Sequence, residues 1–292
     1  MSEEPLVSVI VPFHNRTGLL NALIDSLPDT KEVEIILVDD HSGEEFKLQR
    51  KPYFTKVRTV KLDPDKRYAG SARNKGIEEA FGEFLFFADS DDIVDSRKFM
   101  QAVHEIPEDI DILYTRTSSF LKNGDTGTRH LRYNRIIDQF LAKGDAKHLV
   151  RFHPPWAKFI RRSFIEAHAL YFDQTRVSND VMFNARLHHA NPRRRVSDAV
   201  CYHIREGEPS LTTEATIEDL KQRIEVGAQY NAFLREIGLW EMRSPALPYL
   251  FQMAKIGLMT AIRTAMLLRE SGSPVFWSPA SAKRVRDRVF RD

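Results

Sequence analysis

Short apolar runs rich in β-branched residues alternate with amphipathic stretches through the first 120 residues of this chain. Apolar runs of this length are typical of buried strands, and apolar residues at helical spacing indicate helices between them. The alternation predicts βαβ units and a mostly parallel sheet, in which ligands bind at the carboxyl ends of the strands. We expect strands at residues 7–13, 34–40, 57–63, 83–92 and 111–120, and helices at residues 14–27, 71–82 and 96–106.

Acidic residues stand at two of these carboxyl ends. Asp39 and Asp40 close the second run, and Asp89, Asp91 and Asp92 close the fourth. Neighbouring carboxylates repel each other unless a cation lies between them, and oxygen ligands suit Mg²⁺ or Mn²⁺. Helix capping or turn formation is the structural alternative for such a cluster. For Asp89, Asp91 and Asp92 together we favour a divalent-metal site over capping alone.

A metal held by few protein ligands keeps open positions that substrate phosphates fill. The sequence therefore predicts a bound nucleotide diphosphate, with Asp39 and Asp40 accepting hydrogen bonds from its base or ribose. Arg73 and Asn74 open a predicted helix, where main-chain N–H groups and an arginine favour an anion. Asp95 directly precedes the next predicted helix, so we expect it to cap that helix.

The pattern loosens after residue 120. We expect a helix within residues 153–170, a loop and helix over 177–190, a strand at 199–206, and helices at 215–237 and 248–268. The last helix is very apolar, and the tail at residues 283–292 carries five basic and two acidic side chains. Two interpretations stay open for residues 248–292: packing within the domain or a homodimer, or contact with a membrane surface.

Composition narrows the function classes. The net charge of +2 gives no electrostatic indication of nucleic-acid binding. The single cysteine, Cys201, excludes an intrachain disulfide and fits a reducing compartment. The N-terminal residues lack the apolar region of a signal peptide, and no charge-free stretch reaches 18 residues. We therefore expect a cytoplasmic protein, with peripheral contact to the inner face of the cytoplasmic membrane as an open alternative.

Four sequence blocks carry a family resemblance. VSVIVPFHNR, ILVDDHS, AGSARNKGIEEAFGEFLFFADSDD and PPWAKFIRRSFI, in this order and spacing, resemble the family 2 glycosyltransferases over residues 6–210. The resemblance implies a GT-A fold, an α/β nucleotide-binding sheet flanked by helices, as a domain over residues 1–210. Residues 211–292 would form a helical C-terminal extension. It also implies inverting transfer from a nucleotide-diphospho-sugar, most commonly a UDP-sugar, with Mn²⁺ or Mg²⁺.

The resemblance also implies roles for residues of the donor site. Pro12 would lie near the nucleotide base, and Asp40 would contact the base, with Asp39 as the weaker candidate beside it. Arg73 resembles a donor-site residue of the family. Asp89 would lie near the ribose or the sugar.

Other roles concern the metal and the diphosphate. Asp91 would bind the metal, and Asp92 would share or replace that role. His203 lies where some members have a metal ligand or phosphate contact, although a lone strand histidine is often structural. Arg205 would reach the diphosphate from a loop.

The remaining roles concern catalysis and the acceptor. Inversion requires a general base, and Asp180 matches the family's aspartate, while Asn179 replaces the glutamate that often precedes it. The structural alternative is that Asp180 caps the helix after it. Trp156 and Lys158 resemble the acceptor-side block, although an indole is also good core material.

The leading hypothesis is a bacterial-type enzyme of surface polysaccharide or oligosaccharide synthesis, acting on a saccharide or lipid-linked saccharide acceptor. A sugar nucleotidyltransferase would usually carry a glycine-rich phosphate loop after its first strand, and PFHNRTG has one glycine. A non-catalytic sugar-nucleotide-binding subunit is the alternative outside enzymes. Asp180 and the aspartates at 89–92 argue against it.

Overall fold

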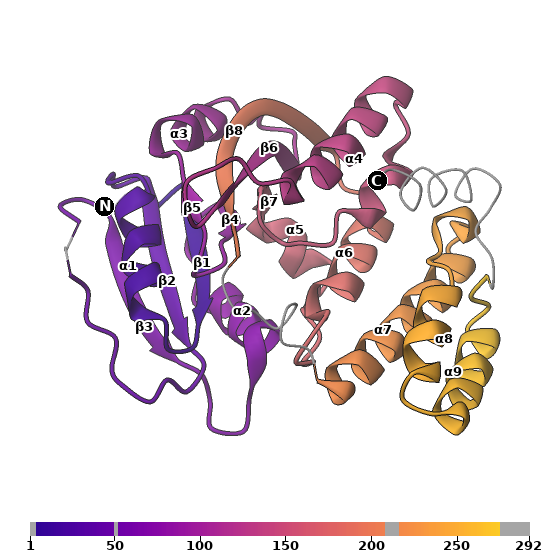
Figure 1. Cartoon of the computed structure of the whole chain (residues 1–292). Coiled ribbons are helices and arrows are strands. Elements are labelled where there is room, and N and C mark those ends of the chain that lie inside the picture. The colour runs from indigo at the N-terminus through magenta and orange to yellow at the C-terminus, as the bar shows by residue number, and fades with distance from the viewer. Residues whose placement is uncertain (1–3, 50–51, 208–215, 275–292) are drawn as a thin grey trace. The chain divides into compact units, whose positions relative to one another are not determined.

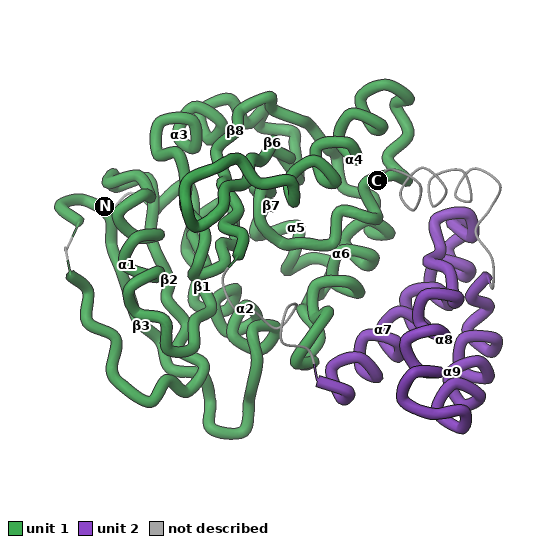
Figure 2. The backbone as a smooth tube through the Cα atoms, in the orientation of Figure 1, with its two compact units in different colours: residues 1–214 green, residues 215–292 purple. Residues whose placement is uncertain are grey.

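The computed structural model describes residues 4–49, 52–207 and 216–274. The chain divides into two compact units, residues 1–214 and 215–292 (Figure 2). The domain boundary expected at 210/211 and the basic tail at 283–292 lie outside the described residues. Each unit is described by itself.

The first unit contains an eight-stranded mixed sheet in the order β3-β2-β1-β4-β7-β6-β8-β5 (Figure 1). The first four strands in the chain run parallel, whereas β7 is antiparallel to both of its neighbours. The sheet is therefore less uniformly parallel than predicted. The strands are β1 (Val7–Phe13), β2 (Val33–Asp39), β3 (Lys56–Lys61), β4 (Phe84–Phe87), β5 (Ile93–Val94), β6 (Ile112–Leu121), β7 (Lys158–Arg161) and β8 (Arg194–Glu206).

Helices connect and flank these strands (Figure 1). The Asp95 carboxylate accepts a 3.0 Å hydrogen bond from the Lys98 main-chain N–H, which confirms the predicted cap of α3. The helices of the first unit are α1 (Thr17–Ser26), α2 (Tyr68–Glu78), α3 (Ser96–His104), α4 (Arg129–Lys143), α5 (Arg162–Ala167) and α6 (Asn179–His189), with a 3₁₀ turn, η1 (Ala146–Arg151).

Some predicted elements were wrong. The strand expected at 83–92 ends at Phe87, because only residues 84–87 pair with β1 and the acidic segment turns away. The helix expected within 153–170 is confirmed as the short helix α5, but the strand β7 that precedes it was not predicted. Strand β7 forms because its backbone pairs with β4 on one side and β6 on the other. Helix α4 was not predicted.

Strands β1 and β2 explain the position of the acids. All seven residues of each strand are buried, as expected for central strands covered on both faces. Their parallel register pairs Phe13 with Asp39, so both strands end at the same edge of the sheet. The core continues through Phe86, whose ring contacts Phe99 and Phe159 at centroid distances of 5.0 and 4.8 Å. This packing fixes the end of β4 beside the ends of β1 and β2.

The second unit is helical within its described residues. It contains α7 (Ile217–Glu236), a 3₁₀ turn η2 (Trp240–Met242), α8 (Leu247–Ala254) and α9 (Leu258–Glu270). The single helix predicted at 248–268 is interrupted after Ala254, next to Gly257, a residue unfavourable in helix interiors. Among the described residues, no helix combines the length and apolar character required to cross a membrane.

Candidate active site

The loops after β1 and β2 are tied to each other. His14 Nδ1 lies 2.6 Å from the Asp40 carbonyl oxygen, and the Asn15 main-chain N–H donates to Ser42 Oγ at 2.8 Å. Asn15 and Arg16 both have left-handed backbone angles, with φ of 57° and 53°. Such conformations are unfavourable for non-glycine residues and persist where surrounding contacts impose them. The loop is therefore held in a defined shape at the edge of the sheet.

Asp39 and Asp40 have different surroundings. The Asp39 carboxylate accepts a 2.8 Å bond from the Ser42 main-chain N–H, which fixes its own loop. Asp40 Oδ2 accepts a 2.9 Å bond from the Tyr68 main-chain N–H. Its other oxygen, Oδ1, is buried and has no hydrogen-bond partner among the residues that the structure describes. A buried acceptor without a partner is costly, so this atom is suited to receive a ligand donor. Pro12 lies buried within β1.

Arg73 connects the end of β4 to the start of α6. Its side chain is 7% exposed, and Nη2 donates to Asp89 Oδ1 at 2.7 Å. Nη1 donates to Asn179 Oδ1 at the same distance. The guanidinium carbon lies 5.4 Å from the centroid of the Phe172 ring. An ion pair, a neutral hydrogen bond and an aromatic contact therefore hold a buried cation beside the acids.

Asp91 and Asp92 differ in accessibility. The Asp91 side chain is 25% exposed, and its carboxylate forms a 3.2 Å ion pair with Arg16. Asp92 is 3% exposed, and its two oxygens accept bonds from the Tyr202 hydroxyl and the Arg205 main-chain N–H, each at 2.7 Å. Both of its oxygens are thus used within the protein. Asp92 holds β8 to the acidic turn, whereas Asp91 is partly buried and keeps a quarter of its side chain accessible.

Burial and mutual repulsion perturb these acids. Burial raises the pKa of Asp91, and the charge of Asp89 raises it further. Burial raises the pKa of Asp92 well above its ordinary value, and the charges of Asp89 and Asp91 act in the same direction. The carboxylates therefore lie close enough to destabilise one another's charge, and a cation among them would relieve that cost.

Asp180 lies in the first turn of α6, but Ser178 occupies the N-cap position. Burial raises the pKa of Asp180, the charge of Arg73 opposes this rise, and the charge of Asp89 adds to it. Asp180 therefore shares the electrostatic environment of the donor-side residues. A carboxylate with a raised pKa is a better proton acceptor than an ordinary one.

The strand β8 separates His203 from the acids. Tyr202 points toward Asp92, so the next residue points to the opposite face of the strand. There His203 Nδ1 lies 2.5 Å from Ser118 Oγ. His203 pairs with Ile93 through its backbone, directly after Asp92, but its imidazole points away from the carboxylates. Arg205 lies on β8 rather than in a loop, and its Nε donates to the Asp91 carbonyl oxygen at 2.8 Å.

Trp156 and Lys158, predicted to lie on the acceptor side, are buried in the core. Trp156 is 1% exposed and stacks on Tyr202 at a centroid distance of 5.4 Å. Lys158 is fully buried, and its Nζ donates to the Phe152 carbonyl oxygen at 2.6 Å and to Asn184 Oδ1 at 2.7 Å. Neither side chain is accessible to an acceptor in this structure. Because β7 is a central strand, the motif that contains them builds the core.

Sequence reasoning missed three residues of the site. Arg16 pairs with Asp91, and its position directly after the first strand is a signal that could have identified it. Tyr202 donates to Asp92 and accepts from the Asp89 main-chain N–H at 2.9 Å. Arg129 contributes positive charge at Asp91. No local sequence signal identifies the last two, because they are more than 35 residues from the acids they affect.

The acidic residues suit a divalent metal that binds together with a phosphate-containing substrate. Among the described ranges, no three His, Cys, Asp or Glu side chains converge into a preformed metal cluster. Asp91 and Asp89 offer carboxylate oxygens at side chains that are 25% and 33% exposed. Mg²⁺ and similar ions are commonly held by one or two carboxylates together with substrate phosphates. The donor set therefore suits a metal that arrives with a diphosphate.

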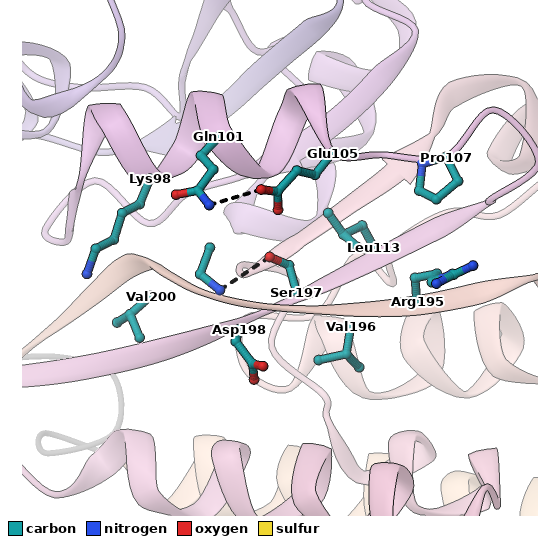
Figure 3. A pocket seen from close by; sticks show the side chains of 11 residues that line it. Lys98, Gln101, Glu105, Pro107, Leu113, Arg195, Val196, Ser197, Asp198 and Val200 are labelled. Atoms are coloured by element: carbon teal, nitrogen blue, oxygen red, sulfur yellow. Dashed lines mark hydrogen bonds between the residues drawn. The ribbon is translucent and has the colours of Figure 1, made fainter.

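A separate cavity of about 560 Å³ lies between α3 and the bulged part of β8 (Figure 3). Gln101 donates a 2.9 Å bond to Glu105 at its rim. None of the predicted site residues lines this cavity. The cavity is lined by Lys98, Gln101, Glu105, Pro107, Leu113 and residues 195–200.

Known proteins resemble this chain in sequence and fold. The uncharacterized glycosyltransferase EpsJ of Bacillus subtilis (strain 168) is 30% identical over 219 residues, which are 71% of this chain. The chain spans only 63% of the length of EpsJ. A crystal structure of S. aureus TarS 1-349 in complex with UDP-GlcNAc has a TM-score of 0.62 at 21% identity, covering 79% of this chain and 71% of that one.

A further solved structure resembles the whole chain. The mannosyltransferase PcManGT from Pyrobaculum calidifontis, in complex with GDP-Man and Mn²⁺, has a TM-score of 0.57 at 16% identity, covering 99% of this chain and 81% of that one. These likenesses confirm the predicted GT-A type of fold. The family model for glycosyl transferase family 2 matches residues 8–168. The chain therefore belongs to glycosyl transferase family 2.

Proposed function

We propose that this protein is an inverting glycosyltransferase that moves a sugar from a nucleotide-diphospho-sugar to an acceptor hydroxyl. The observation that carries the proposal is the contact of Arg73 with both Asp89 and Asn179, each at 2.7 Å. This contact joins the acidic end of β4 to the helix that carries Asp180. A buried cation, a pair of accessible acids and a carboxylate of raised pKa thus share one environment.

The donor base and ribose would bind at the loops after β1 and β2. The unpartnered Asp40 Oδ1 would accept a hydrogen bond from the base or the ribose. Asp39 would hold the loop, and Pro12 would form the floor beside the base. We propose a UDP-sugar, supported by the UDP-GlcNAc complex of TarS. The GDP-Man complex of PcManGT makes a guanosine donor the competitor to test.

Asp91, with Asp89, would hold Mn²⁺ or Mg²⁺ against the donor diphosphate. The presence of Mn²⁺ in the PcManGT complex supports this choice. When bound, the metal would neutralise charge on the departing nucleoside diphosphate. Asp92 would position Tyr202 and β8, because both of its oxygens already accept protein hydrogen bonds. We assign no metal contact to His203.

The chemistry requires one proton transfer and one displacement. Asp180 would take the proton from the acceptor hydroxyl as its oxygen attacks the anomeric carbon. The bond from that carbon to the diphosphate oxygen breaks, and the configuration inverts. Arg73 and Arg205 would stabilise the negative charge that the leaving group gains. Arg16 would also stabilise this negative charge once a metal has taken its place as the partner of Asp91.

The acceptor we propose is a saccharide or a lipid-linked saccharide, in the synthesis of a surface polysaccharide or oligosaccharide. The enzyme would act in the cytoplasm, at the inner face of the cytoplasmic membrane. Residues 248–292 would provide a contact with the membrane or with a second copy of the chain.

A thermal-shift panel tests the donor site. We expect a UDP-sugar to raise the melting temperature in the presence of Mn²⁺, since a ligand that binds only the folded state stabilises it. Asp40→Asn should weaken that shift. If a GDP-sugar raises the melting temperature more than a UDP-sugar does, the proposed donor becomes a GDP-sugar. No shift with any nucleotide, in folded protein, would contradict the proposal. Binding without turnover in every acceptor tested would favour a non-catalytic subunit.

A further inference from the structure

Helices α8 and α9 expose an unusual number of large apolar side chains. Six of them between residues 251 and 266 have exposed fractions between 40% and 75%. Single exposed apolar residues need no explanation, but a cluster on one short segment indicates a binding surface. The six are Phe251, Ile256, Leu258, Met259, Ile262 and Met266.

Helix α9 has one buried face and a second, exposed face that is also apolar. Thr264 and Leu268 are buried, and Leu268 packs with Met253 of α8 in the core of the second unit. Leu258, Ile262 and Met266 recur at every fourth residue, so they share another face of the same helix. That second face is exposed by 44% to 75%. Core packing therefore does not account for these residues.

The charges around this face are mostly positive, although Glu270, the next residue of the same stripe, is an exposed acid at the end of α9. No acidic residue occurs between Glu241 and Glu270, although the chain contains 41 acidic residues in total. Lys255, Arg263 and Arg269 lie within that interval and are exposed. We call the exposed residues of 251–269 the cationic apolar face. Apolar side chains flanked by lysine and arginine are typical of helices that lie in a membrane interface.

Charge complementarity distinguishes among the occupants of the cationic apolar face. In a symmetric dimer the same patch meets its own copy, so three cations and Glu270 on each copy would bring together two surfaces of net positive charge. The tail at residues 283–292 carries five basic and two acidic side chains, so it too would be repelled. An anionic lipid surface attracts each cation and accepts the apolar side chains. We propose that the cationic apolar face docks on an anionic membrane surface.

Vesicle co-sedimentation of the full chain tests the proposal. We expect binding to phosphatidylcholine vesicles that contain phosphatidylglycerol, and much weaker binding to pure phosphatidylcholine. Replacing any one of Lys255, Arg263 and Arg269 by glutamine should lower partitioning about fivefold at low salt. Leu258→Gln/Ile262→Gln/Met266→Gln should lower it at least about tenfold, because the apolar insertion is lost. Glutamine keeps the helix propensity high, and circular dichroism verifies folding.

A matched variant controls for exposed apolar surface in general. Leu131→Gln/Leu141→Gln replaces two side chains of α4 that are each 52% exposed. This variant should bind the anionic vesicles as the natural chain does. Equal binding to neutral vesicles, or full binding by the triple variant, would overturn the proposal. So would a dimer in sedimentation equilibrium that the triple variant abolishes. The assay uses no donor or acceptor, so its failure leaves the proposed transfer reaction intact.

Discussion

The Arg16 guanidinium lies 3.2 Å from the Asp91 carboxylate, and the two side chains are 39% and 25% exposed. Arg16 therefore supplies the positive charge beside the carboxylate that we propose as a metal ligand. The two cations would compete for Asp91. Ion pairs of this exposure contribute about 0.2–1 kcal/mol, so a divalent ion can displace Arg16 at small cost.

Arg16→Gln should bind Mn²⁺ about twofold to fivefold more tightly in the absence of nucleotide, because the competing cation is gone. A calorimetric titration with Mn²⁺ measures this directly. Arg162→Gln is the control, since Arg162 forms an ion pair with Glu166 and contacts none of the site acids. Weaker Mn²⁺ binding by Arg16→Gln would argue that Asp91 is not the metal ligand.

Asp91→Asn and Asp92→Asn should fail in different ways. Asp91→Asn should keep its stability and lose the Mn²⁺-dependent part of the nucleotide thermal shift. Asp92→Asn should lower the free energy of unfolding by about 1–3 kcal/mol, because one amide oxygen replaces two buried acceptors. Urea unfolding at pH 8 measures the second effect. Equal stability of both variants would contradict the structural role of Asp92.

Asp180→Asn should lower kcat by about 10²–10⁴-fold, the usual contribution of a general base. Donor binding should persist, because Asp180 would contact the acceptor rather than the nucleotide. Single-turnover kinetics and donor titration separate the two effects. If Asp180→Asn lowers the affinity for the donor but leaves the single-turnover rate unchanged, Asp180 belongs to the donor site and is not the general base.

The pH dependence of the natural enzyme follows from the same residue. Burial raises the pKa of Asp180, and only its deprotonated form can accept a proton. We expect kcat/KM to rise with pH, with an acidic limb at a higher pH than an ordinary aspartate would give. A profile of kcat/KM against pH checks this, and a rate that falls as pH rises over this limb would contradict it.

Lys158 should make stability depend on alkaline pH. Burial lowers the pKa of Lys158 to about 7, from its ordinary value of 10.5. Between these values the unfolded chain binds the proton and the folded chain does not, so the free energy of unfolding rises with pH. The slope is at most about 1.4 kcal/mol per pH unit for one such group.

Urea unfolding at pH 7.5 and pH 9.5 tests this prediction. Lys158→Met should remove the rise in stability that this group contributes between the two pH values. Lys31→Met, at an exposed position, should leave it unchanged. An equal rise in both variants would mean that other groups cause it.

Local sequence patterns were sufficient to predict β1, β2 and the acids at the carboxyl edge of the sheet. The apolar runs at β1 and β2 predicted buried parallel strands, because central strands require apolar residues on both faces. The acids at their ends therefore lie at the edge where ligands bind. Asp95 was also predictable, because a cap depends on residues within one helical turn.

Tertiary structure decided which side chains of each motif are accessible. Asp91 and Asp92 are adjacent in sequence, yet only Asp92 is sealed, by Tyr202, a residue 110 positions away. Trp156 and Lys158 are buried because β7 pairs between β4 and β6, strands from distant parts of the chain. The sequence by itself determined the buried strands β1 and β2, the acids at their ends and the cap of α3. Burial, pairing and pKa depend on neighbours that only the folded chain brings together.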